Sequence, residues 1–170
     1  MPTVVFVCTA NICRSPVAEA LFVDWLHKQA VPGDWTVGSA GTWAAPGAPA
    51  SAYSRELLGE LGLDLELHRA RHVDRQIVET ADVLLCMTRS QREALRAEFP
   101  DLAGRVHLLS ALAGPAYDVP DPFGGPRQGY TEMVAEIQRL IAAGGRRIVE
   151  LAGSPPEPAS QAAPAGDEKK

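Results

Sequence analysis

The chain has 170 residues, 46% of them hydrophobic and 22% charged, with a formal net charge of −5. This composition is typical of one soluble globular domain and argues against a nucleic-acid binder that works through a broad basic surface. No stretch is long and apolar enough to cross a membrane, no basic region precedes the short apolar run at the N-terminus, and the three cysteines form no CxxC pair. We therefore expect a cytoplasmic protein without a signal peptide, membrane span, disulfide framework or structural zinc.

The first half of the chain alternates short apolar segments with helical patterns. Residues 3–7 are β-branched and aromatic, which predicts a buried strand. After Ser15, apolar residues recur at the spacing of one helical face. Residues 35–39 are predicted as a second strand, and residues 51–61 as a helix that Gly62 ends.

The second half continues the alternation. Residues 83–87 and 106–109 are predicted as strands, with a helix at residues 90–99 between them. A Pro/Gly-rich loop at residues 113–126 leads to a final amphipathic helix that begins near Gln128. Short apolar strands alternating with helices predict a three-layer α/β fold, in which helices cover both faces of a parallel sheet.

Two features qualify the C-terminal part. Gly144 and Gly145 weaken the final helix but do not have to end it. From residue 153 the composition offers almost nothing to bury, so we expect a folded domain at residues 1–152 and a disordered tail at residues 153–170.

The junction between the first strand and the first helix carries the most specific chemistry. Cys8 stands at the carboxyl end of the strand, where ligands bind in open α/β folds. The phosphate loop (residues 9–13) is small enough for its backbone N–H groups to surround an anion. We predict Ser15 as the helix N-cap and Pro16 as the first helical residue, so that the helix dipole points into the same loop. Arg14 adds a planar cation, and together these features favour the thiolate of Cys8 as a nucleophile aimed at phosphorus.

The bare pattern Cys-x5-Arg is weak evidence, because it occurs a second time at residues 86–92, CMTRSQR. The second occurrence carries the bulky side chains of Met87 and Arg89, and its second half is already helical in pattern. We predict Cys86 as a buried thiol at the end of a strand. The context therefore assigns the anion site to Cys8.

The segment VCTANICRSPVAEA resembles the signature loop of the low-molecular-weight protein tyrosine phosphatases. The similarity continues, in the family's order, through residues 39–50 (SAGTWAAPGAPA), 68–71 (HRAR), 81–87 (ADVLLCM) and 118–125 (DVPDPFGG). It covers roughly residues 3–150. The resemblance implies a four-stranded parallel sheet flanked by helices, with the phosphate loop between the first strand and the first helix. It makes residues 1–152 a phosphatase domain.

The resemblance implies a cysteine-dependent phosphatase that hydrolyses phosphotyrosine through a phosphocysteine intermediate. Cys8 is then the nucleophile, Arg14 the phosphate clamp, and Asp121 the acid and base. Asp118 competes for the last role, although turn preferences favour it as a turn or cap residue. No metal or cofactor is expected, since Arg14 and the loop amides supply the charge stabilisation. The implied phosphate-binding residues are Thr9, Ala10, Asn11, Ile12, Cys13, Arg14 and Ser15.

The resemblance also implies a supporting network of Asn11, Ser15, Ser39 and His68. Asn11 tolerates the left-handed backbone of a tight loop, Ser15 donates a hydrogen bond to the Cys8 thiolate, and His68 is a structural partner. Ala10 stands where the family usually has glycine, and would be strained if the backbone there had a positive φ.

Ile12, Trp43 and Phe123 are placed by the resemblance around the mouth of the phosphate loop. Taken singly, Trp43 and Phe123 would be partly buried loop anchors. As an apolar wall they favour the flat ring of phosphotyrosine over phosphoserine, and by a smaller margin over phosphoarginine. Cys8 and Cys13 bracket the loop, so peroxide could drive them to a reversible disulfide. The alternative, weighed equally, is that Cys13 only packs beneath the loop.

Three other functions remain open on the sequence. An arsenate reductase would need further cysteines in a relay, and only Cys86 follows the loop. A phosphoarginine phosphatase would use the same reaction. An inactive phosphate-binding scaffold is disfavoured by the intact Cys8, Arg14 and Asp121. The expected partners are tyrosine-phosphorylated proteins and a cognate tyrosine kinase, with no nucleic acid and no membrane, and the protein is expected as a monomer or weak dimer.

Overall fold

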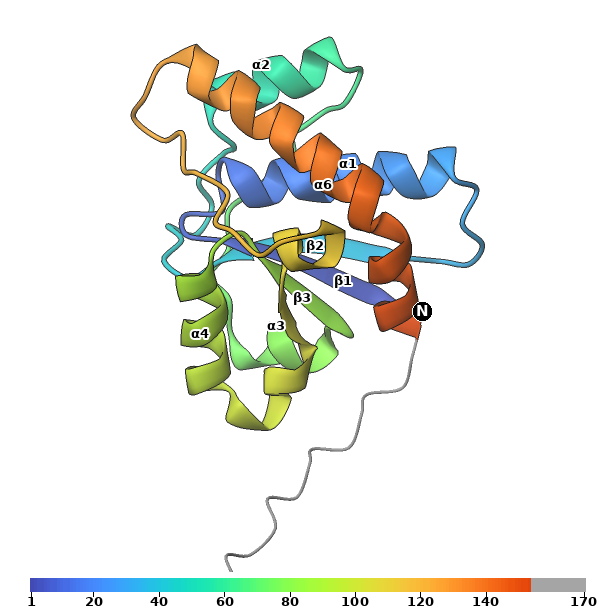
Figure 1. Cartoon of the computed structure of the whole chain (residues 1–170). Helices are drawn as coiled ribbons and strands as arrows, with labels where there is room; N and C mark the ends of the chain where they lie inside the picture. The colour runs from blue at the N-terminus through green and yellow to red at the C-terminus, as the bar shows by residue number, and fades with distance from the viewer. Residues whose placement is uncertain (154–170) are drawn as a thin grey trace, which may run out of the picture.

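The fold is built around one parallel sheet between two layers of helices (Figure 1). The structure, a computed structural model, describes residues 1–153. The four strands lie side by side in the order β2-β1-β3-β4, and every neighbouring pair is parallel. The strands are β1 (Thr3–Cys8), β2 (Thr36–Gly41), β3 (Val83–Cys86) and β4 (Val106–Leu108). The predicted three-layer α/β fold is confirmed.

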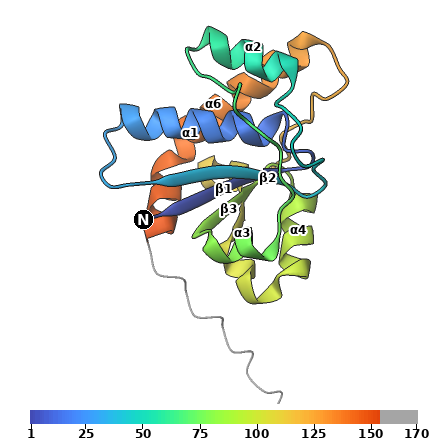
Figure 2. The same ribbon diagram turned by 180° about the vertical axis from the view of Figure 1, so that it is seen from behind.

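Helices cover both faces of the sheet, as the front and back views show (Figures 1 and 2). One layer contains α1 (Arg14–Lys28), α2 (Ala52–Glu60), α5 (Leu109–Ala113) and α6 (Arg127–Gly153). The other contains α3 (Arg75–Thr80), α4 (Arg89–Glu98) and the 3-10 helix η1 (Pro100–Arg105). Within residues 1–153, no helix has both the length and the apolar composition that a membrane crossing requires.

β1 is the central strand, and its side chains divide between the two layers. Val4, Phe6 and Cys8 face the α1 and α6 layer, whereas Val5 and Val7 face the α3 and α4 layer. All five are buried. The two-sided burial explains why this strand is a continuous apolar run, and the strand delivers Cys8 to the carboxyl edge of the sheet.

Several predicted boundaries are wrong in detail. α1 begins at Arg14 with Cys13 as its N-cap, so Ser15 is not the cap and Pro16 is not the first helical residue. β2 begins at Thr36, one residue after the prediction. Three short elements, α3, η1 and α5, were not predicted, because elements of five or six residues show too little periodicity to be detected.

α6 runs through Gly144 and Gly145, as predicted. These glycines allow α6 to cross close to its neighbours: a Cβ at Gly145 would lie 2.6 Å from the ring of Trp25. The helix ends at Gly153, which was predicted to begin the tail. The rest of that predicted tail, residues 154–170, lies outside the described residues.

Candidate active site

The phosphate loop connects β1 to α1, and four carbonyl groups between Cys8 and Ile12 accept hydrogen bonds from residues outside the loop. The carbonyls of Cys8 and Thr9 accept hydrogen bonds from the N–H groups of residues 42 and 43, both at 2.9 Å. The carbonyl of Ile12 accepts from the N–H of residue 51 at 2.8 Å, and that of Asn11 from His68 Nε2 at 2.6 Å. In a trans peptide the N–H points opposite to the carbonyl, so the following N–H groups face the inside of the loop. The loop can therefore surround an anion with backbone donors.

The loop turns at Asn11, whose φ is 56°. Among residues 1–153, the other non-glycine residue with positive φ is Ala30, far from this loop in sequence. Ala10 is therefore not in the left-handed region, and its replacement of the family's usual glycine brings no strain of that kind. The predicted left-handed conformation of Asn11 is confirmed.

Arg14 is buried at the first position of α1, with 3% of its surface exposed. Its Nη1 donates to the carbonyl of Val119 at 3.0 Å, and its Nη2 lies 3.3 Å from Oδ2 of Asp121. Nε is buried and has no hydrogen-bond partner among residues 1–153. An unsatisfied buried donor costs about 1–3 kcal/mol, which a phosphate oxygen would offset. In the same described range, His, Cys, Asp and Glu side chains form no group of three that could hold a metal ion.

The four predicted supporting residues lie together beneath the loop. Asn11 Nδ2 donates to the hydroxyls of Ser15 and Ser39, both at 2.9 Å. Ser39 donates in turn to Glu19 Oε2 at 2.6 Å. The Ser15 hydroxyl also lies 3.0 Å from Cys8 Sγ and 3.5 Å from the carbonyl oxygen of Ala40, to which it donates. The network fixes the Ser15 hydroxyl next to the Cys8 sulfur.

The acid loop (residues 118–123) contacts the Arg14 side chain and contains two aspartates in different settings. Asp121 has a 45% exposed side chain and faces Arg14. Asp118 Oδ1 accepts from the backbone N–H of Arg89 at 2.8 Å and from its Nε at 3.1 Å. The Arg89 N–H, followed by the Arg89 side chain, lowers the pKa of Asp118 despite some desolvation. Asp118 is thus a carboxylate that caps α4 and stays ionised, as turn preferences suggested, whereas Asp121 is partly exposed and faces Arg14.

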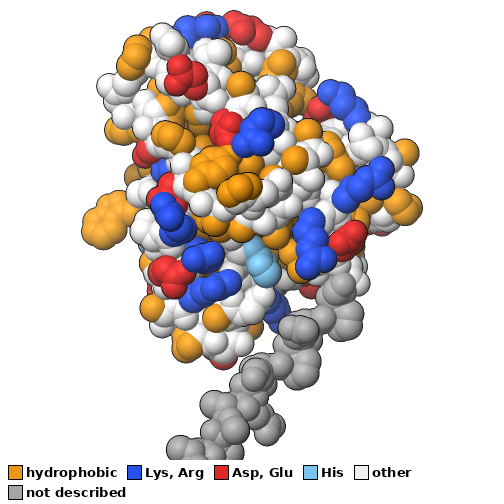
Figure 3. Space-filling model, in the orientation of Figure 1, with side chains coloured by type: hydrophobic (Ala, Val, Ile, Leu, Met, Phe, Trp, Pro, Cys, Tyr) orange, Lys and Arg blue, Asp and Glu red, His pale blue; other side chains and the backbone are white. Residues whose placement is uncertain are grey.

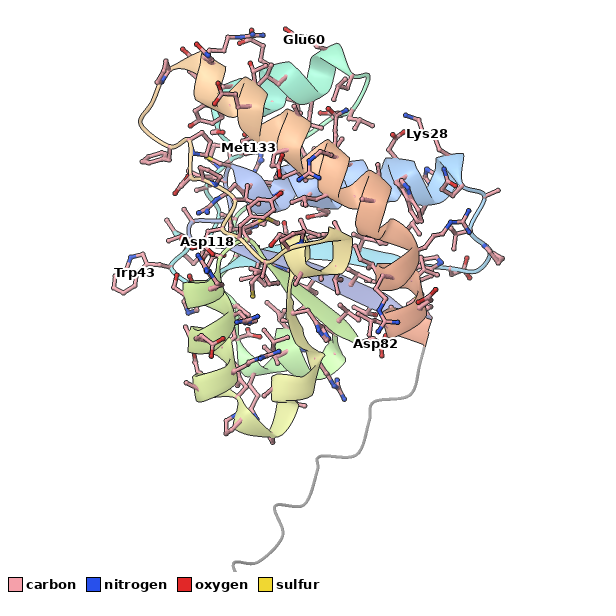
Figure 4. The ribbon with its side chains drawn as sticks, in the orientation of Figure 1. Lys28, Trp43, Glu60, Asp82, Asp118 and Met133 are labelled. Carbon is pink, nitrogen blue, oxygen red and sulfur yellow. The ribbon has the colours of Figure 1, made fainter. Side chains whose placement is uncertain are left out.

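The three residues predicted at the mouth differ in exposure. Ile12 is half-buried against the core, whereas Trp43 is 82% and Phe123 is 67% exposed. An apolar side chain protrudes at the left edge of Figure 3, where Figure 4 labels Trp43. Trp43 and Phe123 are therefore not partly buried loop anchors. Their exposure leaves both rings free to contact a ligand.

The other two cysteines are buried and unsuited to attack. Burial raises the pKa of Cys13, whose thiol donates to the Tyr130 hydroxyl at 3.6 Å. The predicted disulfide between Cys8 and Cys13 stays a prediction, since all three cysteines are free. Burial raises the pKa of Cys86 to about 12, and this thiol ends β3 as predicted.

Sequence reasoning missed several residues that hold the loop. Arg71 donates its backbone N–H to Asn11 Oδ1 at 2.9 Å. A Cβ at Gly41 would lie 2.4 Å from the carbonyl oxygen of Thr9, so only glycine fits at the end of β2. Gln91 Nε2 donates to Thr9 Oγ1 at 3.1 Å. Only Gln91 had a local signal, its place three residues after Thr88 in a capping box.

Comparison with known proteins now decides the family. Residues 3–144 match the low molecular weight phosphotyrosine protein phosphatases. The chain belongs to this family. It is 35% identical over 149 residues to a probable low molecular weight protein-tyrosine-phosphatase, EpsP of Ralstonia solanacearum, covering 88% of this chain and 97% of that protein. It is 34% identical over 139 residues to a protein-arginine-phosphatase of Geobacillus stearothermophilus, covering 81% and 90%.

A solved relative extends the comparison to structure. It is a mutant of the YwlE arginine phosphatase with a phosphorylated active-site serine, at 30% identity and a TM-score of 0.81, covering 87% of this chain and 96% of that one. The sheet order 2-1-3-4 is the fold of this family. The protein is a phosphatase of the family, and its relatives divide between tyrosine and arginine phosphatases.

Proposed function

We propose that this phosphatase hydrolyses phosphotyrosine in proteins through a phosphocysteine intermediate at Cys8. The observation that carries the proposal is the convergence of three groups on the phosphate loop. Cys8 Sγ lies 3.0 Å from the Ser15 hydroxyl, the buried Arg14 Nε has no partner among residues 1–153, and Asp121 faces Arg14. The phosphorylated serine in the active site of the YwlE mutant supports a covalent intermediate.

The reaction proceeds in two displacements on phosphorus. The Cys8 thiolate attacks the phosphorus, the P–O bond to tyrosine breaks, and Asp121 gives its proton to the departing phenolate oxygen. A water then attacks the phosphocysteine, Asp121 takes its proton, and the S–P bond breaks to return the thiolate and inorganic phosphate. Arg14 and the loop amides stabilise the phosphoryl oxygens in both steps, and Ser15 stabilises the thiolate as it leaves.

Ile12 and its surroundings favour an aromatic ring over a guanidinium. The Ile12 side chain has no hydrogen-bonding group, and the exposed aromatic side chains of Trp43 and Phe123 can stack on a ring. A substrate guanidinium would need acceptors for its N–H groups. The two aspartates of the acid loop already pair with the protein's own arginines, Asp118 with Arg89 and Asp121 with Arg14. Guanidinium N–H groups that become buried against the Ile12 side chain without a partner would cost about 1–3 kcal/mol. Phosphoserine is too short to reach Cys8 unless the peptide backbone enters the mouth.

Phosphoarginine is the second candidate substrate, because an arginine phosphatase and a tyrosine phosphatase are almost equally similar to this chain, at 34% and 35% identity. The test is kcat/KM for one peptide carrying phosphotyrosine, phosphoarginine or phosphoserine at the same position. We expect values that fall in that order, with phosphoserine far below the other two.

Ile12→Thr provides the matched variant, because threonine keeps the β-branch and adds a hydroxyl. It is expected to raise the ratio of phosphoarginine to phosphotyrosine turnover. A wild-type preference for phosphoarginine would show that phosphoarginine, and not phosphotyrosine, is the substrate. A ratio that Ile12→Thr leaves unchanged would show that Ile12 does not determine the choice of substrate.

A further inference from the structure

The first turn of α4 lies between the phosphate loop and the acid loop and contacts both. On the phosphate-loop side, Gln91 is buried, with 5% of its surface exposed. Its Oε1 accepts the backbone N–H groups of Met87 and Thr88, each at 3.0 Å. Two backbone donors on one carbonyl oxygen fix the orientation of the amide. Nε2 is thereby directed at Thr9 Oγ1, 3.1 Å away, outside the helix.

On the acid-loop side, Arg89 holds Asp118 with two hydrogen bonds, one from the backbone and one from the side chain. Figure 4 places Asp118 at the end of α4 nearest the strand ends. The next residue, Val119, donates its N–H to the carbonyl of Met87 at 2.9 Å and accepts from Arg14. The start of the acid loop is therefore fixed to the same turn that fixes Thr9.

We propose that the first turn of α4 sets the position of the two loops relative to each other. Gln91 positions the phosphate loop through Thr9, and Arg89 positions the acid loop through Asp118. Both residues act through the loops that they hold, so both are positioning residues. The second half of the proposal rests on the proposed role of Asp121 as proton donor.

The Gln91 contact is tested with a double-mutant cycle on Thr9. Thr9→Val removes the hydroxyl and leaves the helix cap intact, whereas Gln91→Met removes the amide together with its capping role. Each is expected to lower kcat about tenfold, and the double variant no more than the larger single change, because both break one contact. The melting temperature is expected to fall for Gln91→Met and to stay near wild type for Thr9→Val. Additive losses, or full activity of Thr9→Val, would overturn this half.

The Asp118 contact is tested through leaving groups. p-Nitrophenolate leaves readily without a proton, whereas phenolate needs one, so displacement of the acid affects phenyl phosphate more. Asp118→Ala is expected to lower kcat/KM, which reports the step that forms the phosphocysteine, about fivefold with phenyl phosphate and less than twofold with p-nitrophenyl phosphate. Equal losses on both substrates would indicate a general structural effect and overturn this half.

Two further variants distinguish failure of the positioning role from failure of the proposed acid. The kcat/KM of Asp121→Asn is measured on the same pair of substrates, since the later hydrolysis of the phosphocysteine is common to both. If it shows no dependence on the leaving group, the proposed acid is wrong; if it does and Asp118→Ala does not, only the positioning role fails. Arg92→Ala is the matched control, since Arg92 follows Gln91 in α4 and its Nε contacts Glu93 on the same helix. It is expected to keep wild-type kcat on both substrates.

Discussion

Two junctions in this protein share the pattern Cys-x5-Arg at the end of a parallel strand, and only one is built to bind an anion. Between β1 and α1 the chain uses residues 9–13 as a loop, so Arg14 is the first residue of its helix. Between β3 and α4 only residues 87 and 88 intervene, and Arg92 lies inside the helix. The same spacing in sequence therefore gives a loop in one place and a helical turn in the other.

The donors at the two helix N-termini also differ. At α4 the first N–H groups are satisfied by the protein itself: Asp118 accepts from Arg89, and Thr88 and Gln91 form a capping box. At α1 the N-cap, Cys13, makes no side-chain capping hydrogen bond. A helix N-terminus binds a ligand anion when its own side chains leave the N–H groups free. The comparison shows that capping residues, more than the spacing of Cys and Arg, separate the two sites.

The largest expected effect distinguishes Cys8 from Cys86 when each is replaced by serine. Cys8→Ser is expected to reduce turnover of p-nitrophenyl phosphate to background, because a serine hydroxyl is not ionised at this site. Cys86→Ser is expected to keep kcat, since this thiol is buried and its pKa is raised to about 12. Circular dichroism checks that both variants fold. Loss of turnover in Cys86→Ser with the fold intact would contradict the assignment.

The second effect separates the two aspartates of the acid loop. Asp121→Asn is expected to lower kcat for phenyl phosphate by roughly 10²–10⁴, the usual contribution of a positioned proton donor. Asp118→Asn is expected to lower it less than tenfold, since asparagine keeps an acceptor for the Arg89 N–H. A larger loss in Asp118→Asn would transfer the role of acid to Asp118.

The third effect concerns the space that β2 leaves for the phosphate loop. Gly41→Ala would place a Cβ 2.4 Å from the Thr9 carbonyl and 3.0 Å from the Asn11 nitrogen, so the loop must move. We expect a loss of kcat/KM of about tenfold or more, because small displacements of positioned groups are costly. Gly59→Ala in α2 is the matched control, with nothing within 4 Å of its Cβ. Unchanged kcat/KM in Gly41→Ala would show that the loop tolerates displacement.

The smallest effect is a pH-dependent stability from Asp118. Its pKa is lowered in the folded protein, so its contribution is present above the unfolded-state pKa and is lost as the pH falls through the folded-state pKa. Wild type is therefore expected to be slightly more stable than Asp118→Asn at pH 7, and equal to it in acid. Urea unfolding at several pH values measures the difference. A difference that stays constant with pH would exclude the charge of Asp118 as its cause.

Local patterns account for much of the fold, whereas Asp121, Ser39 and His68 were assigned to the site through the family resemblance. The strand at residues 3–7, the helix after it and the small polar loop between them were readable because each depends on neighbours in sequence. The start of α1 was misplaced because Ser15, a residue that suits a cap, turns its hydroxyl to Cys8 instead. Gly41 and Tyr130 depend on contacts with distant segments, so no local pattern reports them.

Because β1 is buried on both faces, loss of activity is expected to be coupled to unfolding of the whole domain. Cys8 ends a strand that is paired on both edges and buried on both faces. Moving Cys8 out of the site therefore requires disruption of both helical layers. The amide hydrogens of β1 are then expected to exchange with solvent only through global unfolding, with activity and fold lost together in denaturant.

Trp43 and Phe123 are exposed on loops and contribute little to the packing of the fold. Substitutions there can alter substrate preference at little cost in stability, so specificity can evolve while the catalytic strand stays unchanged.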